Sequence, residues 1–326
     1  MAGEYNGVPG DALADPPTTD LASQLDLASP CLARRLGAGP PLLLDGATGT
    51  ELERRGVPSE LPLWSTLGLI RAPETVLAVH CDYVLAGVDA LTADTFRTQE
   101  RALARAGEGG RACELTRLAV SLARRAAGAA RAGRRVLVLG SAPPLEDCYR
   151  PELTPGDVEL AREHAAHAAN LCEAGVDAIL AETHNSVREA RAAARAACEA
   201  GAPFLVSFVC DAAARLLSGE PLAEALAAVA PLGPLAVGVN CLPASAVPAC
   251  LPALRACGLP FAVQANLGAP TPRGERSEAL SPERFAGLAG AWIEAGARAV
   301  GGCCGTTPAH LAALAHWLGR GPAQET

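Results

Sequence analysis

Two cysteines, Cys303 and Cys304, lie side by side among glycines at the end of an apolar run near the C-terminus. A third, Cys241, closes the apolar run 236–241. Thiolates are strong zinc ligands, and flanking glycines let a backbone and a ligand approach each other closely. These residues indicate a metal site. The alternative is that Cys241 is a small core residue and Cys303 and Cys304 form a tight turn.

The separation between Cys241 and Cys303 is far longer than in a zinc finger, so only the fold can bring their thiols together. Eight apolar runs typical of strands recur along the chain, at 42–45, 90–96, 136–140, 178–183, 204–208, 236–241, 261–266 and 299–304. Helical stretches separate them, among them 74–86, 112–132, 159–174, 187–200 and 282–295. Nearly continuous apolar runs indicate strands buried on both faces, as in parallel sheets.

Eight alternating β/α units predict an α/β fold, the (β/α)8 TIM barrel, with zinc at its C-terminal mouth. An open doubly wound sheet is disfavoured, because no Gly-x-Gly-x-x-Gly follows the first strand. The polar residues that close the runs are Asp45, Asp94, Glu182, Asn240, Cys241, Asn266, Cys303 and Cys304. Because barrel enzymes carry out chemistry at the carboxyl ends of the strands, we expect these side chains to share one mouth.

The sixth and eighth strands flank the seventh in such a barrel, so the three thiols can converge. Three protein ligands with an open fourth position are typical of catalytic zinc. Asn266, at the end of the seventh strand, could fill that position with its amide oxygen until a substrate arrives.

Two other stretches have suggestive spacing. The small-residue turn 46–50 follows Asp45, and its amides could bind a carboxylate or phosphate, or the turn could serve packing alone. Glu163, His164 and His167 lie in the predicted helix 159–174, but their order does not match His-Glu-x-x-His. We expect these three residues on a polar helix face, without a metal.

At 326 residues, half of them apolar, the chain is long enough for one large barrel. We expect residues 1–40 to form a mobile N-terminal extension, residues 41–320 the (β/α)8 barrel, and residues 321–326 a tail. Within the extension, residues 21–36 are compatible with a short amphipathic helix that covers the barrel bottom or belongs to the tail.

The net charge of −8 argues against a nucleic-acid partner. No apolar run approaches the roughly 20 residues needed to span a membrane. Residues 1–10 lack the basic start and apolar stretch of a signal peptide. The 12 cysteines therefore indicate a cytoplasmic protein with free thiols, and the oligomeric state stays open.

Several motifs at the strand ends resemble the zinc-dependent homocysteine S-methyltransferases, over residues 41–317. The motifs are 45–52, 182–183, 238–241, Asn266 with Gly268, and 301–306. The resemblance implies Zn²⁺ as cofactor, with Cys241, Cys303 and Cys304 as metal-binding and catalytic residues. It implies that Asn266 is the exchangeable oxygen ligand of some members, and that L-homocysteine and a methyl donor are the small-molecule substrates.

The same resemblance suggests substrate-binding residues. Asp45 and Glu182 match acidic residues that hold the homocysteine ammonium in the family. The amides of Gly46, Ala47 and Thr48 are expected to receive its carboxylate. Asp94, Trp64 and Phe96 could favour a cationic donor, although packing explains the two rings equally well.

The family divides by methyl donor: betaine, methyl-folate on a cobalamin enzyme, or a sulfonium. Residues 63–65 and 79–87 are most similar to free-standing members that use S-methylmethionine, so this donor or S-adenosylmethionine is expected. The chain departs from those members at Asp94, at 264–265 and at 141–147. These departures leave open another donor, another thiol, or a non-catalytic barrel that binds zinc and an amino acid.

Overall fold

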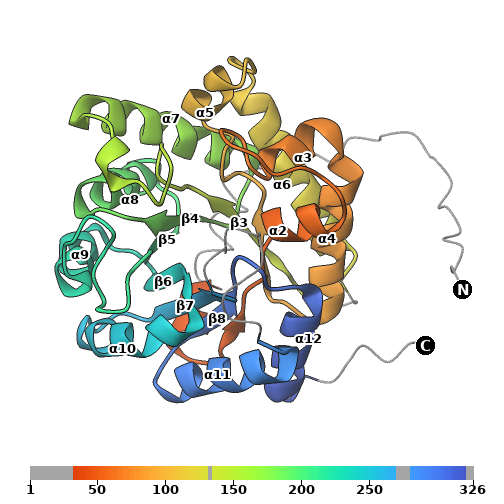
Figure 1. Cartoon of the computed structure of the whole chain (residues 1–326), viewed down its shortest axis with the longest axis vertical. Helices are drawn as coiled ribbons and strands as arrows, with labels where there is room; N and C mark the ends of the chain where they lie inside the picture. Colours follow the sequence, from red (N-terminus) through yellow and green to blue (C-terminus); the bar gives the residue numbers. More distant parts are fainter. Residues whose placement is uncertain (1–31, 131–133, 269–279, 321–326) are drawn as a thin grey trace, which may run out of the picture.

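The computed structural model describes residues 32–130, 134–268 and 280–320, and helices surround a central ring of strands (Figure 1). The strands are β1 (Leu42–Leu43), β2 (Ala90–Ala93), β3 (Leu137–Ser141), β4 (Ala178–His184), β5 (Phe204–Phe208), β6 (Ala236–Pro243), β7 (Phe261–Asn266) and β8 (Ala299–Gly302). All eight coincide with the predicted apolar runs, which confirms the (β/α)8 barrel.

The strands form one parallel sheet in the order β1-β8-β7-β6-β5-β4-β3-β2. A parallel bridge between Leu44 and Ala90 joins the two ends of this order and closes the barrel. β6 and β8 both pair with β7, as the metal-site prediction requires.

The α-helices are α2 (Gly49–Arg54), α3 (Thr66–Arg71), α4 (Pro73–Ala86), α5 (Glu100–Arg105), α6 (Ala112–Gly128), α7 (Asp157–Ala174), α8 (Val187–Glu199), α9 (Leu222–Val229), α10 (Val247–Ala256), α11 (Pro282–Glu294) and α12 (Pro308–Trp317). Short 3-10 turns are η1 (Pro151–Leu153), η2 (Ala230–Leu232) and η3 (Ala244–Ala246). The five helices expected from the sequence are α4, α6, α7, α8 and α11, and α6 ends earlier than expected. No helix among the described residues combines the length and apolar character needed to cross a membrane.

The strands separate two apolar layers. In β3, Leu137 and Leu139 belong to the cluster inside the barrel, whereas Val138 belongs to the cluster between strands and helices. This alternation continues along the strand, so Ser141 faces inward at its carboxyl end. Other strands also become polar there, with Thr92, Glu182 and Gln264 lining the cavity described below. The barrel is therefore apolar at its base and polar at its mouth.

The base of the barrel is covered by residues 32–37, which are helical. Leu32 and Leu36 are buried and join the interior cluster, which the first residues of several strands form. Arg298 fixes the segment, since its Nε donates to Leu36 O at 2.9 Å.

The prediction of a mobile extension over residues 1–40 is therefore wrong for residues 32–40. The apolar inward side chains at the amino ends of the strands need cover from water, and this segment supplies it. Its position matches the alternative of a helix over the barrel bottom. The remainder of the expected extension, residues 1–31, and the tail 321–326 lie outside the described residues.

We predict that Leu36→Ala lowers the free energy of unfolding by about 2–5 kcal/mol, because it removes a buried side chain (1% exposed) from the interior cluster. Urea unfolding of the full chain measures this change. The matched control is Leu85→Ala, at a position 71% exposed, which should change it by less than about 0.5 kcal/mol. Equal losses in both variants would contradict a structural role for residues 32–37.

Candidate active site

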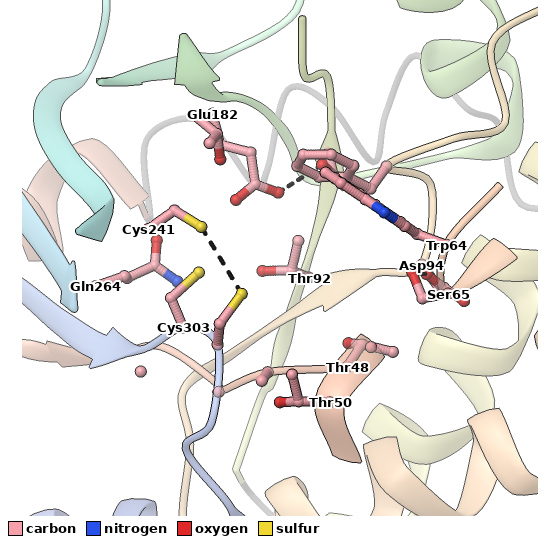
Figure 2. A pocket seen from close by; sticks show the side chains of 18 of the residues that line it. Thr48, Thr50, Trp64, Ser65, Thr92, Asp94, Glu182, Cys241, Gln264 and Cys303 are labelled. Atoms are coloured by element: carbon pink, nitrogen blue, oxygen red, sulfur yellow. Dashed lines mark hydrogen bonds between the residues drawn. The ribbon is translucent and has the colours of Figure 1, made fainter. Parts of the chain in front are cut away.

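A cavity of about 410 Å³ opens at the carboxyl ends of the strands (Figure 2). Its volume lies in the range of small-molecule sites. Nearly all residues proposed from the sequence line it, namely Asp45, Gly46, Ala47, Thr48, Trp64, Asp94, Phe96, Glu182, Cys241, Cys303 and Cys304. Six of the eight polar strand-end residues thus share one cavity, as the barrel prediction required, whereas Asn240 and Asn266 do not line it.

The three cysteines form a compact donor set. The sulfur atoms of Cys241, Cys303 and Cys304 lie within 4.8 Å of one another, and none of the three cysteines forms a disulfide. Cys241 Sγ is 3.7 Å from Cys304 Sγ. Four ligands arranged tetrahedrally, with metal–sulfur bonds of about 2.3 Å, require sulfur separations of about 3.8 Å. The donor set therefore fits a metal ion. Among the described residues it is the only such group of His, Cys, Asp or Glu side chains.

Asn266 ends β7 between the two cysteine-bearing strands. It is 2% exposed, and its Oδ1 accepts no hydrogen bond from the described part of the chain. A buried amide oxygen without a partner is uncommon, so a missing ligand would account for it. Asn266 itself does not line the cavity, whereas Gln264, two residues earlier on the same face, does. Ligation by Asn266 stays a prediction.

A local change of backbone turns Cys241 into the cavity. Regular alternation after an inward Asn240 would point Cys241 toward the helices. Instead the register of β6 shifts between Asn240 and Pro243, and Cys241 has a φ of 57°. β4 repeats the arrangement, with a register shift after Ala181 and a φ of 60° at Thr183. Such a left-handed conformation costs about 1–3 kcal/mol for a residue other than glycine, so the surrounding structure must hold it.

Asn240 links the two irregular strand ends. Its Oδ1 accepts from Thr183 N at 2.8 Å, and its Nδ2 donates to Thr183 Oγ1 at 2.7 Å and to Glu182 Oε2 at 3.1 Å. The side chain is fully buried, where hydrogen bonds are costly to lose. From the sequence, Asn240 was recognised only as a polar strand end. In the structure it connects Glu182 to the turn that presents Cys241.

Asp45 and Glu182 are two buried carboxylates that face the cavity. Asp45 accepts from Thr92 N at 2.7 Å and Thr92 Oγ1 at 2.9 Å, and Glu182 accepts from Ser141 Oγ at 2.5 Å. Burial raises the pKa of each carboxyl to about 7, and the hydrogen bonds offset part of this rise. Neither carboxylate forms a salt bridge with the residues that the structure describes, so a bound cation would relieve an unbalanced charge.

The two glycine-containing turns, at residues 45–50 and 302–306, are joined by hydrogen bonds. Gly302 N donates to Asp45 O at 2.9 Å, Ala47 N donates to Thr306 Oγ1 at 3.2 Å, and Gly305 N donates to Thr50 Oγ1 at 2.9 Å. A Cβ atom on Gly302 would collide with the Thr306 side chain. The turn 46–50 therefore has a packing role, and the Ala47 amide is already engaged within the protein. This corrects the expectation that Ala47 N receives a carboxylate.

Trp64 and Asp94 lie across the cavity from the cysteines (Figure 2). The Arg97 guanidinium carbon is 4.7 Å from the Trp64 ring centre and 5.2 Å from that of Phe96. Packing against Arg97 therefore explains in part why the two rings lie where they do. Asp94 accepts from Ser65 Oγ at 2.5 Å, and its Oδ2 has no partner within the described ranges. Burial raises the pKa of Asp94 to about 6.

The structure adds Tyr149 to the site and corrects the view of α7. Tyr149 lies in an irregular loop without strand or helix periodicity, and its hydroxyl is 2.9 Å from Cys241 Sγ. His164 and His167, expected on a polar helix face, are both buried. Their Nε2 atoms face Glu189 Oε1 and Ser141 O, so they support the segment at the end of β3 and the loop that follows it.

Comparison with known proteins identifies relatives over most of the chain. The family model described as homocysteine S-methyltransferase matches residues 42–318. A homocysteine S-methyltransferase of Escherichia coli (strain K12) is 35% identical, with 84% of this chain and 94% of that protein covered. Homocysteine S-methyltransferase YbgG of Bacillus subtilis is 31% identical, with 85% and 94% covered.

Among solved structures, the metallated form of the homocysteine methyltransferase MmuM from Escherichia coli matches with a TM-score of 0.73. It is 31% identical, and the match covers 86% of this chain and 96% of that one.

We predict that Cys303→Ala lowers the metal content of the purified, reduced protein from about one ion per chain to a small fraction, because two thiolates hold a metal poorly. Elemental analysis measures the stoichiometry. Cys198→Ala removes an exposed thiol and serves as the control that should retain the metal. Equal metal content in both variants would rule out the three-cysteine site.

Proposed function

The chain belongs to the homocysteine S-methyltransferase family, and on that premise we propose that it methylates the thiol of L-homocysteine with S-methylmethionine, giving methionine. S-Adenosylmethionine is the second donor we consider. One observation carries the proposal. A three-cysteine cluster shares a single cavity with two buried carboxylates that form no salt bridge with the described residues, which suits a substrate with both a thiol and an ammonium group.

We propose that the metal is Zn²⁺, held by Cys241, Cys303 and Cys304, with the amide oxygen of Asn266 as a fourth ligand that the substrate displaces. A bound zinc ion would supply the positive charge that removes the thiol proton near pH 7, where a free thiol is mostly protonated. The sulfur spacing and the unpartnered Oδ1 of Asn266 support this assignment.

We assign the amino-acid end of homocysteine to the part of the cavity that Asp45 and Glu182 line. Asp45 and Glu182 would hold the ammonium through charge-assisted hydrogen bonds, each of which contributes about 1.5–3 kcal/mol. Their raised pKa values reflect burial without a cation, and the ammonium would supply that cation. Gly46 and Thr48, which line the cavity beside Asp45, are assigned to the carboxylate.

The donor is assigned to the wall formed by Asp94, Trp64 and Phe96. A sulfonium is already activated, because a neutral thioether leaves when the methyl carbon–sulfur bond breaks. The substrate sulfur forms the new bond with its own electron pair, so no side chain needs to transfer a proton to the methyl group. The task of this wall is to hold the donor in line with the thiol. The buried Asp94 carboxylate favours a cation there.

A donor screen tests the proposal. Zinc-loaded, reduced protein is incubated with homocysteine and, in turn, S-methylmethionine, S-adenosylmethionine, betaine or methyl-folate, and methionine formation is measured. We expect the fastest turnover with S-methylmethionine. Faster turnover with betaine or methyl-folate would replace the donor assignment. Homocysteine binding without turnover of any donor would favour the non-catalytic barrel.

We predict that Glu182→Gln and Asp94→Asn affect different substrates. Glu182→Gln should raise the KM for homocysteine by about 10–100-fold, because it removes one charge-assisted bond to the ammonium. Asp94→Asn should raise the KM for the sulfonium donor and leave that for homocysteine within about twofold. Each variant is the control for the other in steady-state kinetics. If either variant raised the KM values for homocysteine and for the donor equally, the assignment of Glu182 to homocysteine and of Asp94 to the donor would be refuted.

A further inference from the structure

The hydroxyl of Tyr149 lies against a sulfur of the metal site. Its Oη is 2.9 Å from Cys241 Sγ. The Tyr149 side chain is 43% exposed, so burial in the core does not explain its orientation. An exposed tyrosine would normally sample several rotamers, and holding one of them costs conformational entropy. Other contacts in the structure must therefore hold the Tyr149 side chain in the rotamer that places its hydroxyl against Cys241 Sγ.

The loop that carries Tyr149 is anchored by side chains buried behind it. His167 bonds to Ser141 O, at the end of β3, at 2.9 Å, and three others bond to carbonyls of the loop itself: His184 to Ala142 O at 3.2 Å, Arg97 to Glu146 O at 2.9 Å, and Asn185 to Cys148 O at 3.0 Å. A fifth, Glu189, accepts from Leu145 N at 2.8 Å. All five are almost completely buried. Such bonds are costly to break, so the loop is held as a fixed wall of the cavity.

The distance also distinguishes between two roles for the hydroxyl. An oxygen in the fourth position of a tetrahedral zinc site, at about 2.0 Å from the metal, would lie about 3.5 Å from each sulfur. The observed 2.9 Å is shorter and matches a direct hydrogen bond to Cys241 Sγ. A cysteine that binds a metal is a thiolate and can only accept, so the tyrosine hydroxyl is the donor.

We propose that Tyr149 is a positioning residue of the metal centre, which donates a hydrogen bond to the Cys241 thiolate, and that Asn185 keeps it there. The bond draws electron density from that sulfur, so the sulfur donates less to the metal. A bound metal ion would then keep more positive charge, and a substrate thiol held there would ionise at lower pH. This last consequence rests on the proposed function, whereas the hydrogen bond itself does not.

Spectroscopy of the cobalt-substituted full chain tests the proposal without any substrate. In Tyr149→Phe the sulfur-to-cobalt charge-transfer band should move to longer wavelength, because the thiolate electrons rise in energy when the hydrogen bond is lost. Zinc affinity, measured against a competing chelator, should fall by about 10-fold, the low end for loss of a group bonded to a metal ligand. The ring is retained, so folding should be preserved.

Tyr83→Phe is the matched control. Its hydroxyl is buried next to the cavity-lining residue Ala47, where it donates to Ala47 O at 2.8 Å and not to a sulfur. The cobalt band of Tyr83→Phe should stay where it is in the unmodified protein. Asn185→Leu should shift the band in the same direction as Tyr149→Phe, by a smaller amount. The double variant with Tyr149→Phe should show no more than the Tyr149→Phe shift, since Asn185 acts through Tyr149.

An unchanged cobalt band and unchanged zinc affinity in Tyr149→Phe would overturn the proposal. Additive shifts in the double variant would overturn the part assigned to Asn185. If the enzyme turns over homocysteine, the acid limb of its pH–rate profile should move to higher pH in Tyr149→Phe. Because the band requires neither homocysteine nor a donor, a failure of the proposed methyl transfer leaves this test intact.

Discussion

The site depends on the hydrogen bonds of Asn240. Strand alternation would point the Cys241 thiol away from the cavity, and only a left-handed backbone at that residue brings it to Cys303 and Cys304. That conformation is unfavourable for a residue other than glycine. Asn240 holds the corresponding turn at Thr183 and also bonds to Glu182. One buried amide thereby joins the metal site to the residue assigned to the substrate ammonium.

The electrostatics of the cavity follow from the same arrangement. The three clustered thiols and three buried carboxyls, those of Asp45, Glu182 and Asp94, face a single space, which Cys148 also lines. Burial raises the pKa of all three carboxyls, because charge is poorly solvated there. A metal ion, an ammonium and a sulfonium each bring the positive charge that the cavity lacks. The nearby cation Arg97 is stacked on Trp64 and bonded to loop carbonyls.

Sequence patterns predicted the barrel and most of the cavity lining, because strands buried on both faces are continuously apolar until they end at the mouth. Asp45, Glu182 and the three cysteines stand out for that reason. The contribution of Tyr149 was not predictable, since its loop has no periodicity and its contact depends on bonds from residues as distant as Arg97. The cover provided by Leu32 and Leu36 was only an alternative, because a short helix is recognised by what it buries. The packing role of Ala47 depended on Thr306, which lies far along the chain.

The central claim is that the cysteine site takes up homocysteine as a thiolate. Calorimetry of homocysteine binding, in two buffers of different ionisation enthalpy near pH 7, measures the protons released per ligand bound. The account predicts that the zinc-loaded protein releases about one proton from each homocysteine thiol, because the free thiol is mostly protonated at this pH. It also predicts that the metal-free protein binds homocysteine weakly and releases about one proton fewer, since only the carboxyls of Asp45 and Glu182, whose pKa values lie at about 7, then lose protons to solvent. Tight binding without proton release, unchanged by removal of the metal, would contradict it.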